Sequence, residues 1–578
     1  MKKLLSLLLA MALLASCVPF ASAENAGRIY SRQYPIYAYD EETKFTNEYP
    51  LFFIDGVDDM PWIDVEEMAD IATILQREVI ESSSFELTYK QEGSTITLTR
   101  ENGFFMHLDF DKNVITFSDY NAFVKKPEAQ TLLDLLNVSA VNEAGEAELF
   151  QRDAMASYDR YGDAMVLDLS EYGIHLVMDE DRGYIPLQTA NDFVFSPLMD
   201  RSLLFNTAAM FFANDSDLYD INTGKYTPLA ELYYSVAPQD RSAAFADYGY
   251  NELCLMLDSL YGLKKKHNID TFAHLFWEIG FDELLSDTSA FNADQALYNF
   301  ICYYLDDLHS AFGLRSWMTG RERGLEGGDG PSERSFSAQE KRYKNMREKF
   351  LGEKVEAYQE VGDTAYVTFD EFTSKYKGAY YYEAAAKGTR LEDTIGLMIY
   401  AHQQINRENS PIKNVVIDLS NNIGGSADAA LFVISWILGE AEVSIEDTFT
   451  SAQTTMVYRA DVNLDHKFDE RDTLDGKHVY CLISPVSFSC GNLVPAVCKE
   501  NQAVTLIGRT SGGGACVVQP MSTAWGAVFQ ISGTSRLSFR KNGSFYDIDE
   551  GVAPDVYLSR LETMYDRAKL NDLINNLP

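Results

Sequence analysis

The sequence of residues 414–438 is NVVIDLSNNIGGSADAALFVISWIL, and it decides the fold of the C-terminal part of the chain. Its first six residues are rich in valine and isoleucine, which is typical of a buried strand. Residues 427–438 form an apolar run that is long enough for a buried helix. The Gly424-Gly425 pair between them predicts a tight turn whose N–H groups can hold negative charge. The alternative is a strand-to-helix turn without a function.

The segments on either side of this unit also alternate between strands and helices. Residues 364–369 and 479–483 are apolar runs of strand length, and residues 393–406 are predicted to be a helix. Strands that alternate with helices are typical of a layered α/β arrangement. We therefore predict an α/β multidomain protein whose C-terminal domain covers residues 346–578.

Three further regions precede this domain. Residues 24–135 contain period-two alternation, as at residues 94–99, and predict a β-rich domain. Residues 136–225 predict a second β or mixed domain. In residues 226–345, apolar side chains recur at helical spacing, which predicts a helical domain. Its polar, glycine-rich stretch at residues 319–340 predicts a linker or mobile loop.

The composition narrows the classes of partner. The 578 residues contain 48 Lys and Arg against 87 Asp and Glu, which is a net charge of −39. A chain this acidic lacks the basic face that nucleic acids and anionic membranes require, so we expect neither as a partner. The cysteines that follow Cys17 match no metal motif in their spacing, so we expect buried free thiols.

The N-terminus predicts export from a bacterial cell. Two lysines precede the apolar residues 4–15, which are too few to span a bilayer as a helix. Small residues around Ala23 predict signal-peptidase cleavage there, which makes the first 23 residues a signal peptide. The alternative is a lipoprotein, because the sequence LASC ending at Cys17 resembles a lipobox. Both interpretations give a secreted or cell-surface protein, and we expect no transmembrane helix in the mature chain.

Two further features carry side chains suited to catalysis. Residues 483–492 read ISPVSFSCGN, in which a buried strand again turns sharply into a helix. Ser489 stands at the start of that helix, where the macrodipole favours a developing anion. His309 ends another predicted helix, and imidazole is the base that a serine nucleophile needs near neutral pH. Taken singly, a helix cap and a structural histidine explain these two residues better.

Four motifs in this order resemble the tail-specific (C-terminal processing) serine peptidase family, S41. They are Asp418-x-x-Asn421-x-x-Gly424-Gly425, Ser487-Phe488-Ser489-Cys490-Gly491, Gly508-Arg509-Thr510-Ser511-Gly512-Gly513 and Glu550-Gly551-Val552-Ala553-Pro554-Asp555. The resemblance spans about residues 355–560, and His309 lies upstream of it. It implies a crotonase-like core of spiral ββα layers and the activity of a serine peptidase, which is a hydrolase.

The resemblance also implies roles for single residues. It makes Ser489 the nucleophile and assigns the oxyanion hole to the N–H groups of Gly425 and Cys490. Members with a Ser-Lys dyad carry a lysine at the position where this sequence has Gly513. The absence of that lysine makes the chain similar to the tricorn-like branch, which uses serine, histidine and an acid, with His309 as the base.

The acid is expected just before the Gly-Val-x-Pro-Asp segment. Asp549 and Glu550 both qualify, and Asp549 is favoured, although the usual family position falls at Ile548. The sequence thus predicts an exported serine endopeptidase that cleaves a protein or peptide through an acyl-enzyme and needs no cofactor for catalysis. One alternative is an inactive peptide- or ligand-binding cell-surface protein on the same fold. Another is an interaction protein that works through its N-terminal domains.

A second type of site is predicted in residues 461–472, DVNLDHKFDERD. Oxygen atoms stand at positions 1, 3, 5, 7, 9 and 12 of this loop, which is the ligand spacing of an EF-hand. They belong to Asp461, Asn463, Asp465, the carbonyl of Lys467, Asp469 and Asp472. The pattern predicts a structural calcium ion. The alternative is an acidic hairpin in solvent, because His466 replaces the usual glycine.

Overall fold

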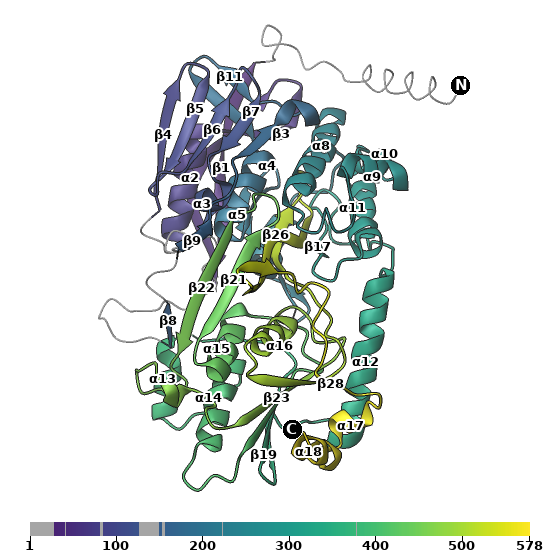
Figure 1. Cartoon of the computed structure of the whole chain (residues 1–578). Coiled ribbons are helices and arrows are strands. Elements are labelled where there is room, and N and C mark those ends of the chain that lie inside the picture. The colour runs from purple at the N-terminus through teal and green to yellow at the C-terminus, as the bar shows by residue number, and fades with distance from the viewer. Residues whose placement is uncertain are drawn as a thin grey trace.

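The computed structural model describes residues 28–40, 42–80, 85–125, 149–152, 157–221, 223–376 and 378–577. The predicted signal peptide and Cys17 lie outside these residues. In Figure 1 the N-terminal sheets lie at the top and the C-terminal parallel sheet at the bottom, and the long helix α12 runs down one side.

Two large sheets form most of the N-terminal part. The seven-stranded sheet has the order β11 (Val177–Asp179), β12 (Arg182–Pro186), β3 (Val57–Asp64), β2 (Glu42–Ile54), β1 (Ile29–Asp40), β14 (Met210–Ala213), β13 (Ser202–Phe205). The five-stranded sheet has the order β10 (Met165–Asp168), β7 (Val114–Phe117), β6 (Phe105–Asp109), β5 (Thr95–Arg100), β4 (Leu87–Glu92). The division predicted at residue 135 separates strands that pair, because β3 pairs with β12 and β7 with β10.

Buried and partly exposed side chains alternate along these strands, as the period-two pattern of the sequence predicts. Ile96 and Leu98 of β5 are fully buried, and the threonines between them are partly exposed. Helices accompany the sheets, and they include α2 (Val65–Glu78), α3 (Tyr120–Val124), α4 (Leu187–Ala190), the π-helix η3 (Asn191–Phe195), α5 (Ser196–Met199), α6 (Asp215–Leu218) and α7 (Pro228–Tyr233).

Helices dominate the region that follows, as the spacing of apolar residues predicts. They are α8 (Ala243–Leu260), α9 (Phe272–Ile279), α10 (Asp282–Leu285), α11 (Ala290–Asn299) and the π-helix η4 (Phe300–Leu305). The linker predicted over residues 319–340 is wrong in its second half. Helix α12 (Pro331–Leu351) begins there, because proline suits the first position of a helix.

The C-terminal part contains the predicted α/β layer. Its six-stranded sheet has the order β18 (Tyr358–Val361), β19 (Thr364–Thr368), β20 (Asn414–Asp418), β23 (His478–Ile483), β24 (Val504–Gly508), β28 (Val556–Tyr557). All neighbours pair in parallel except β18 with β19. The accompanying helices are α13 (Gly378–Ala386), α14 (Thr394–Ile405), α15 (Ala427–Leu438), α16 (Cys490–Glu500), α17 (Glu562–Tyr565) and α18 (Arg567–Asn575). The α/β fold is therefore confirmed.

A third large sheet, with eight strands, joins distant parts of the chain. Its path is β17 (Ala311–Leu314), β26 (Val528–Lys541), β21 (Ala441–Asp447), β22 (Gln453–Ala460), β8 (Phe150–Arg152). The side strands are β25 (Cys516–Ser522), β27 (Ser544–Tyr546) and β9 (Ser157–Arg160). Strand β17 follows His309 and pairs with β26, so the helical region is tied to the C-terminal part next to that histidine.

Two other expectations concern the described residues. Their six cysteines are free thiols, five of them buried, as predicted. Within the described ranges, every helix is too short or too polar to cross a membrane.

Candidate active site

Ser489 stands at a sharp turn between β23 and α16. Its backbone has φ 54° and ψ −122°, which L-residues rarely adopt, and its side chain forms no capping bond to the helix. Its N–H donates to the Gly513 carbonyl at 2.9 Å. Such a conformation costs about 1–3 kcal/mol and persists where the surrounding structure enforces it. The predicted helix cap therefore does not explain this serine.

Glycines allow the two strand ends to meet at this turn. A Cβ at Gly424 would lie 2.6 Å from the Cβ of Ser489, and one at Gly491 would lie 2.6 Å from the Asn422 carbonyl oxygen. The N–H of Phe488 donates to the same Asn422 oxygen at 3.1 Å. The turn after β20 thus packs directly on the turn after β23, as neighbouring parallel strands require.

Gly425 and Cys490 lie side by side next to Ser489. The Cys490 thiol donates to the Gly425 carbonyl at 3.2 Å. A Cβ at Gly425 would lie 2.3 Å from the Phe372 oxygen, so only glycine fits there. Neither the Gly425 nor the Cys490 N–H donates to another described residue. Two free amides beside a serine can stabilise an oxyanion.

Ser487, two residues earlier, has a different environment. It is fully buried, its hydroxyl donates to the Leu419 carbonyl at 2.7 Å, and it accepts the Ser484 N–H at 2.9 Å. Its hydroxyl therefore joins two strand ends and is not available for attack.

His309 reaches the same place from the turn between η4 and β17. Its ring lies against Phe488, with centroids 4.6 Å apart, and its Cε1 would be 3.1 Å from a Cβ at Gly514. The Gln530 side chain donates to its carbonyl at 2.8 Å, and its N–H donates to Asp307 at 3.2 Å. His309 is 8% exposed, and no hydrogen bond joins it to Ser489 among the described residues. Such bonds in active sites often form only when substrate is bound.

Burial and charge act in opposite directions on this histidine. Burial lowers the pKa of His309 below its ordinary value, and the charges of Asp307 and Asp549 counteract part of that shift. The imidazole is consequently neutral at neutral pH, which is the form that can accept a proton from serine.

The structure separates the two candidate acids. The Asp549 side chain is 7% exposed, whereas that of Glu550 is 83% exposed. Burial raises the pKa of Asp549, but hydrogen bonds from Lys266 and the Ala515 N–H, with the charges of Lys266 and His309, outweigh burial and lower it overall. Ile548 is buried and its carbonyl accepts from Asn492 at 2.9 Å. Of the two candidates, Asp549 is thus the ionised carboxylate whose charge acts on His309.

Lys266 is a residue of this site that sequence reasoning missed. Its Nζ contacts the carboxylates of Asp549 and Glu550. The only signal in the sequence is the run Lys264-Lys265-Lys266 after the helix pattern, which by itself indicates a solvated turn.

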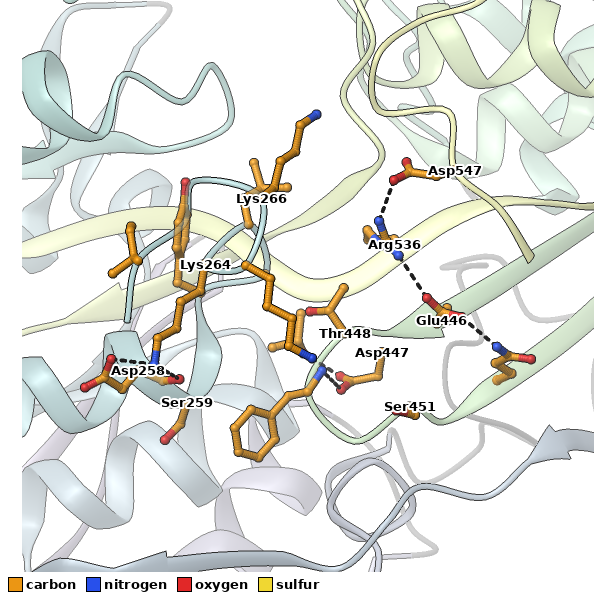
Figure 2. A pocket seen from close by; sticks show the side chains of 18 of the residues that line it. Asp258, Ser259, Lys264, Lys266, Glu446, Asp447, Thr448, Ser451, Arg536 and Asp547 are labelled. Atoms are coloured by element: carbon orange, nitrogen blue, oxygen red, sulfur yellow. Dashed lines mark hydrogen bonds and ion pairs between the residues drawn. The ribbon is translucent and has the colours of Figure 1, made fainter. Parts of the chain in front are cut away.

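A pocket of about 660 Å³ adjoins this lysine without including Ser489, His309 or Asp549. In Figure 2 two of the lining cations are paired, Lys264 with Asp258 and Arg536 with both Glu446 and Asp547.

The predicted calcium loop has its oxygens in one turn, but they accept protein hydrogen bonds. Asp461 accepts the His466 N–H and the Tyr382 hydroxyl, both at 2.7 Å. Asp472 accepts the Val462 N–H at 2.8 Å. Further contacts include those of Arg471 with Asp465 and Asp469, of the Asp465 N–H with Asn463, and of the Lys467 N–H with Asp465. Within the described ranges no three His, Cys, Asp or Glu side chains are arranged to hold a metal, so calcium stays a prediction.

Comparison with known proteins identifies the C-terminal part. Residues 363–558 match the model of peptidase family S41. Over this segment the chain is similar to peptidase family S41. The resemblance of the motifs is therefore confirmed over this segment, which contains Ser489 and Asp549, while His309 and Lys266 come from outside it.

Individual relatives are distant or match only in part. A protein of Chlamydia pneumoniae is 34% identical over 99 residues, which are 17% of this chain and 16% of that protein. A photosystem II D1 C-terminal processing protease is 18% identical, with a TM-score of 0.25, over 34% of this chain and 42% of its own. Mature CPAF complexed with lactacystin is 12% identical, with a TM-score of 0.37, over 58% of this chain and 99% of its own. The chain thus matches about a sixth of the Chlamydia protein and under half of the processing protease.

Proposed function

We propose that this protein is an exported serine endopeptidase in which Ser489 is the nucleophile, His309 the base and Asp549 the acid. One observation supports the proposal most. Ser489 is held in a strained turn beside two free amides, with a neutral histidine on the neighbouring ring of Phe488. A serine needed only for structure gains nothing from such a conformation.

The chemistry follows from these positions. The Ser489 hydroxyl attacks the carbonyl carbon of a peptide bond while His309 takes its proton. The carbonyl oxygen becomes an oxyanion that accepts hydrogen bonds from the Gly425 and Cys490 N–H groups. His309 then donates the proton to the leaving amine, and the acyl-enzyme forms. Water, deprotonated by the same histidine, hydrolyses the ester and restores Ser489.

A fluorophosphonate probe tests the proposal directly, because it reacts with an activated serine. We expect the wild-type protein to be labelled at Ser489 and to cleave an unfolded protein substrate. The Ser489→Ala variant should do neither. A folded wild-type protein that is not labelled would instead support the inactive binding protein on the same fold.

Export rests on the sequence of the first 23 residues. Mass spectrometry of the protein from its native cells is the test. A mature chain that begins after Ala23 supports cleavage, a lipid on Cys17 supports the lipoprotein, and an intact N-terminus contradicts both.

A further inference from the structure

We propose that Lys266 is a positioning residue of the active site, which holds the Asp549 carboxylate beside His309. The inference rests on the proposed function. Lys266 lies in the turn between α8 and α9, outside the S41 segment, and its Nζ contacts Asp549 and Glu550.

Asp549 is fixed through both of its carboxylate oxygens. Oδ1 accepts the Ala515 N–H at 2.8 Å, and Oδ2 accepts from Lys266. The Asp549 main-chain carbonyl accepts the Gly514 N–H at 3.1 Å, and His309 lies over the same glycine. Without Lys266, one oxygen of a nearly buried carboxylate loses its protein partner, and the group can rotate away from the histidine.

The turn that carries Lys266 is itself anchored. The Gly262 N–H donates to the Ser532 carbonyl at 2.8 Å, and a Cβ at Gly262 would lie 2.0 Å from the Gly533 oxygen. Lys264 pairs with the buried Asp258 at 2.7 Å. These contacts hold the backbone that leads into Lys266 in place before a substrate binds.

Strand β26, which contains Ser532 and Gly533, also positions His309. Gln530 of β26 donates to the His309 carbonyl at 2.8 Å, and the Ser532 N–H donates to the Ser310 hydroxyl at 3.2 Å. Strand β26 therefore holds both the base and the turn of Lys266, so the distance between His309 and the Lys266–Asp549 pair is set by one rigid element.

Lys266 is unsuited to act as a base in place of the missing dyad lysine. Burial lowers the pKa of Lys266, but hydrogen bonds and charges from Asp549 and Glu550 raise it overall. The ammonium group thus stays protonated, and its contacts are with the two carboxylates rather than with Ser489.

The positive charge also acts on His309 through Asp549. The charged groups that act on His309 are Asp307 on its own turn and Asp549. Removal of the Lys266 charge leaves two carboxylates without a balancing cation. The imidazolium then becomes more stable, and the pKa of His309 rises.

Lys266→Met tests the inference, because it keeps most of the length of the unbranched side chain and removes the charge. We expect kcat to fall about 10- to 100-fold with KM unchanged, since the reacting groups are misplaced while the substrate contacts remain. The acid limb of kcat/KM should move to higher pH. Lys266→Arg should restore most of kcat and the wild-type limb. Lys265→Met is the matched control, because Lys265 is an exposed neighbour on the same turn, and it should leave activity unchanged.

The outcomes separate this inference from the proposed function. If Ser489→Ala remains active, the proposed function is wrong. If Ser489→Ala is inactive while a folded Lys266→Met keeps the wild-type kcat and acid limb, only the positioning role is wrong. A folded Lys266→Arg that is as inactive as Lys266→Met would also contradict it, because the charge alone should suffice. Melting curves of each variant identify those that are folded.

Discussion

Ser489 and its two amides come from the ends of neighbouring strands in one parallel sheet, whereas His309 and Lys266 arrive on turns of the helical region. In the first group, each position is dictated by contacts within residues 372–513, such as Gly424 against Ser489 and Gly425 against Phe372. In the second group, strand β26 supplies the anchoring contacts from more than 200 residues away. The position of the proposed nucleophile therefore depends on the sheet alone, whereas the positions of the proposed base and of its supporting charges depend on how the whole chain folds.

The largest effect should come from the nucleophile. Ser489→Ala is expected to lower kcat by a factor on the order of 10⁴ or more, with the melting temperature kept, because nothing else can form the acyl-enzyme. Ser487→Ala is the matched control from the same turn. It should retain kcat but lose about 1–3 kcal/mol of unfolding free energy, since its buried hydroxyl bridges Leu419 and Ser484. Equal losses of kcat in both variants would contradict the assignment.

The next effect concerns the base. His309→Ala should remove nearly all activity, and the wild-type kcat/KM should rise with pH as His309 loses its proton. Since burial lowers the pKa of His309, this rise should lie below the ordinary histidine value of 6.5. A rise centred above 6.5, or a profile without any acid limb, would show that another group is the base.

A smaller loss of kcat is expected when the turn that packs against Ser489 is disturbed. Gly424→Ala places a methyl group 2.6 Å from the Ser489 Cβ, so the nucleophile must move. Displacement of about 1 Å costs on the order of 10²-fold in kcat. Gly476→Ala is the control, because Gly476 also has positive φ (71°) but open space around it. Wild-type kcat in Gly424→Ala would mean that the turn tolerates a side chain.

The backbone strain at Ser489 can be measured as a difference in the free energy of unfolding between two variants. Ser489→Gly should unfold with about 1 kcal/mol more free energy than Ser489→Ala, because glycine adopts φ 54° without a steric penalty. Both variants lack the nucleophile, so activity does not confound the comparison. Chemical denaturation gives the two free energies, and a more stable alanine variant would argue against strain.

The smallest effect is expected from calcium binding to the loop of residues 461–472, and it concerns the stability of the fold. With a dissociation constant of about 10⁻⁴ M, 1 mM calcium adds about 1.4 kcal/mol to the free energy of unfolding. The melting temperature of chelator-treated protein should therefore rise with calcium, and the rise should vanish in Asp461→Asn. An unchanged melting temperature would leave an acidic hairpin held by Arg471 and backbone amides.

Much of the C-terminal fold can be predicted from the sequence, because its strands are buried on both faces and are therefore continuous apolar runs. The runs at residues 364–369, 414–419 and 479–483 coincide with β19, β20 and β23 within a residue or two. The helix start at Pro331 was hidden by a polar composition, since exposed helices share that composition with loops.

The sequence by itself determined the two strand-to-helix turns, because glycine pairs, small polar residues and buried strands act over a few positions. It also pointed to Ser489 and His309 through motifs of fixed spacing. The sequence already favoured Asp549 over Glu550, but the burial and the Lys266 contact of Asp549 come only from the tertiary structure, because they depend on segments about 280 residues apart. Neither the role of Ser487 nor the contact of Lys266 has a local signature, since both depend on which distant strand lies opposite.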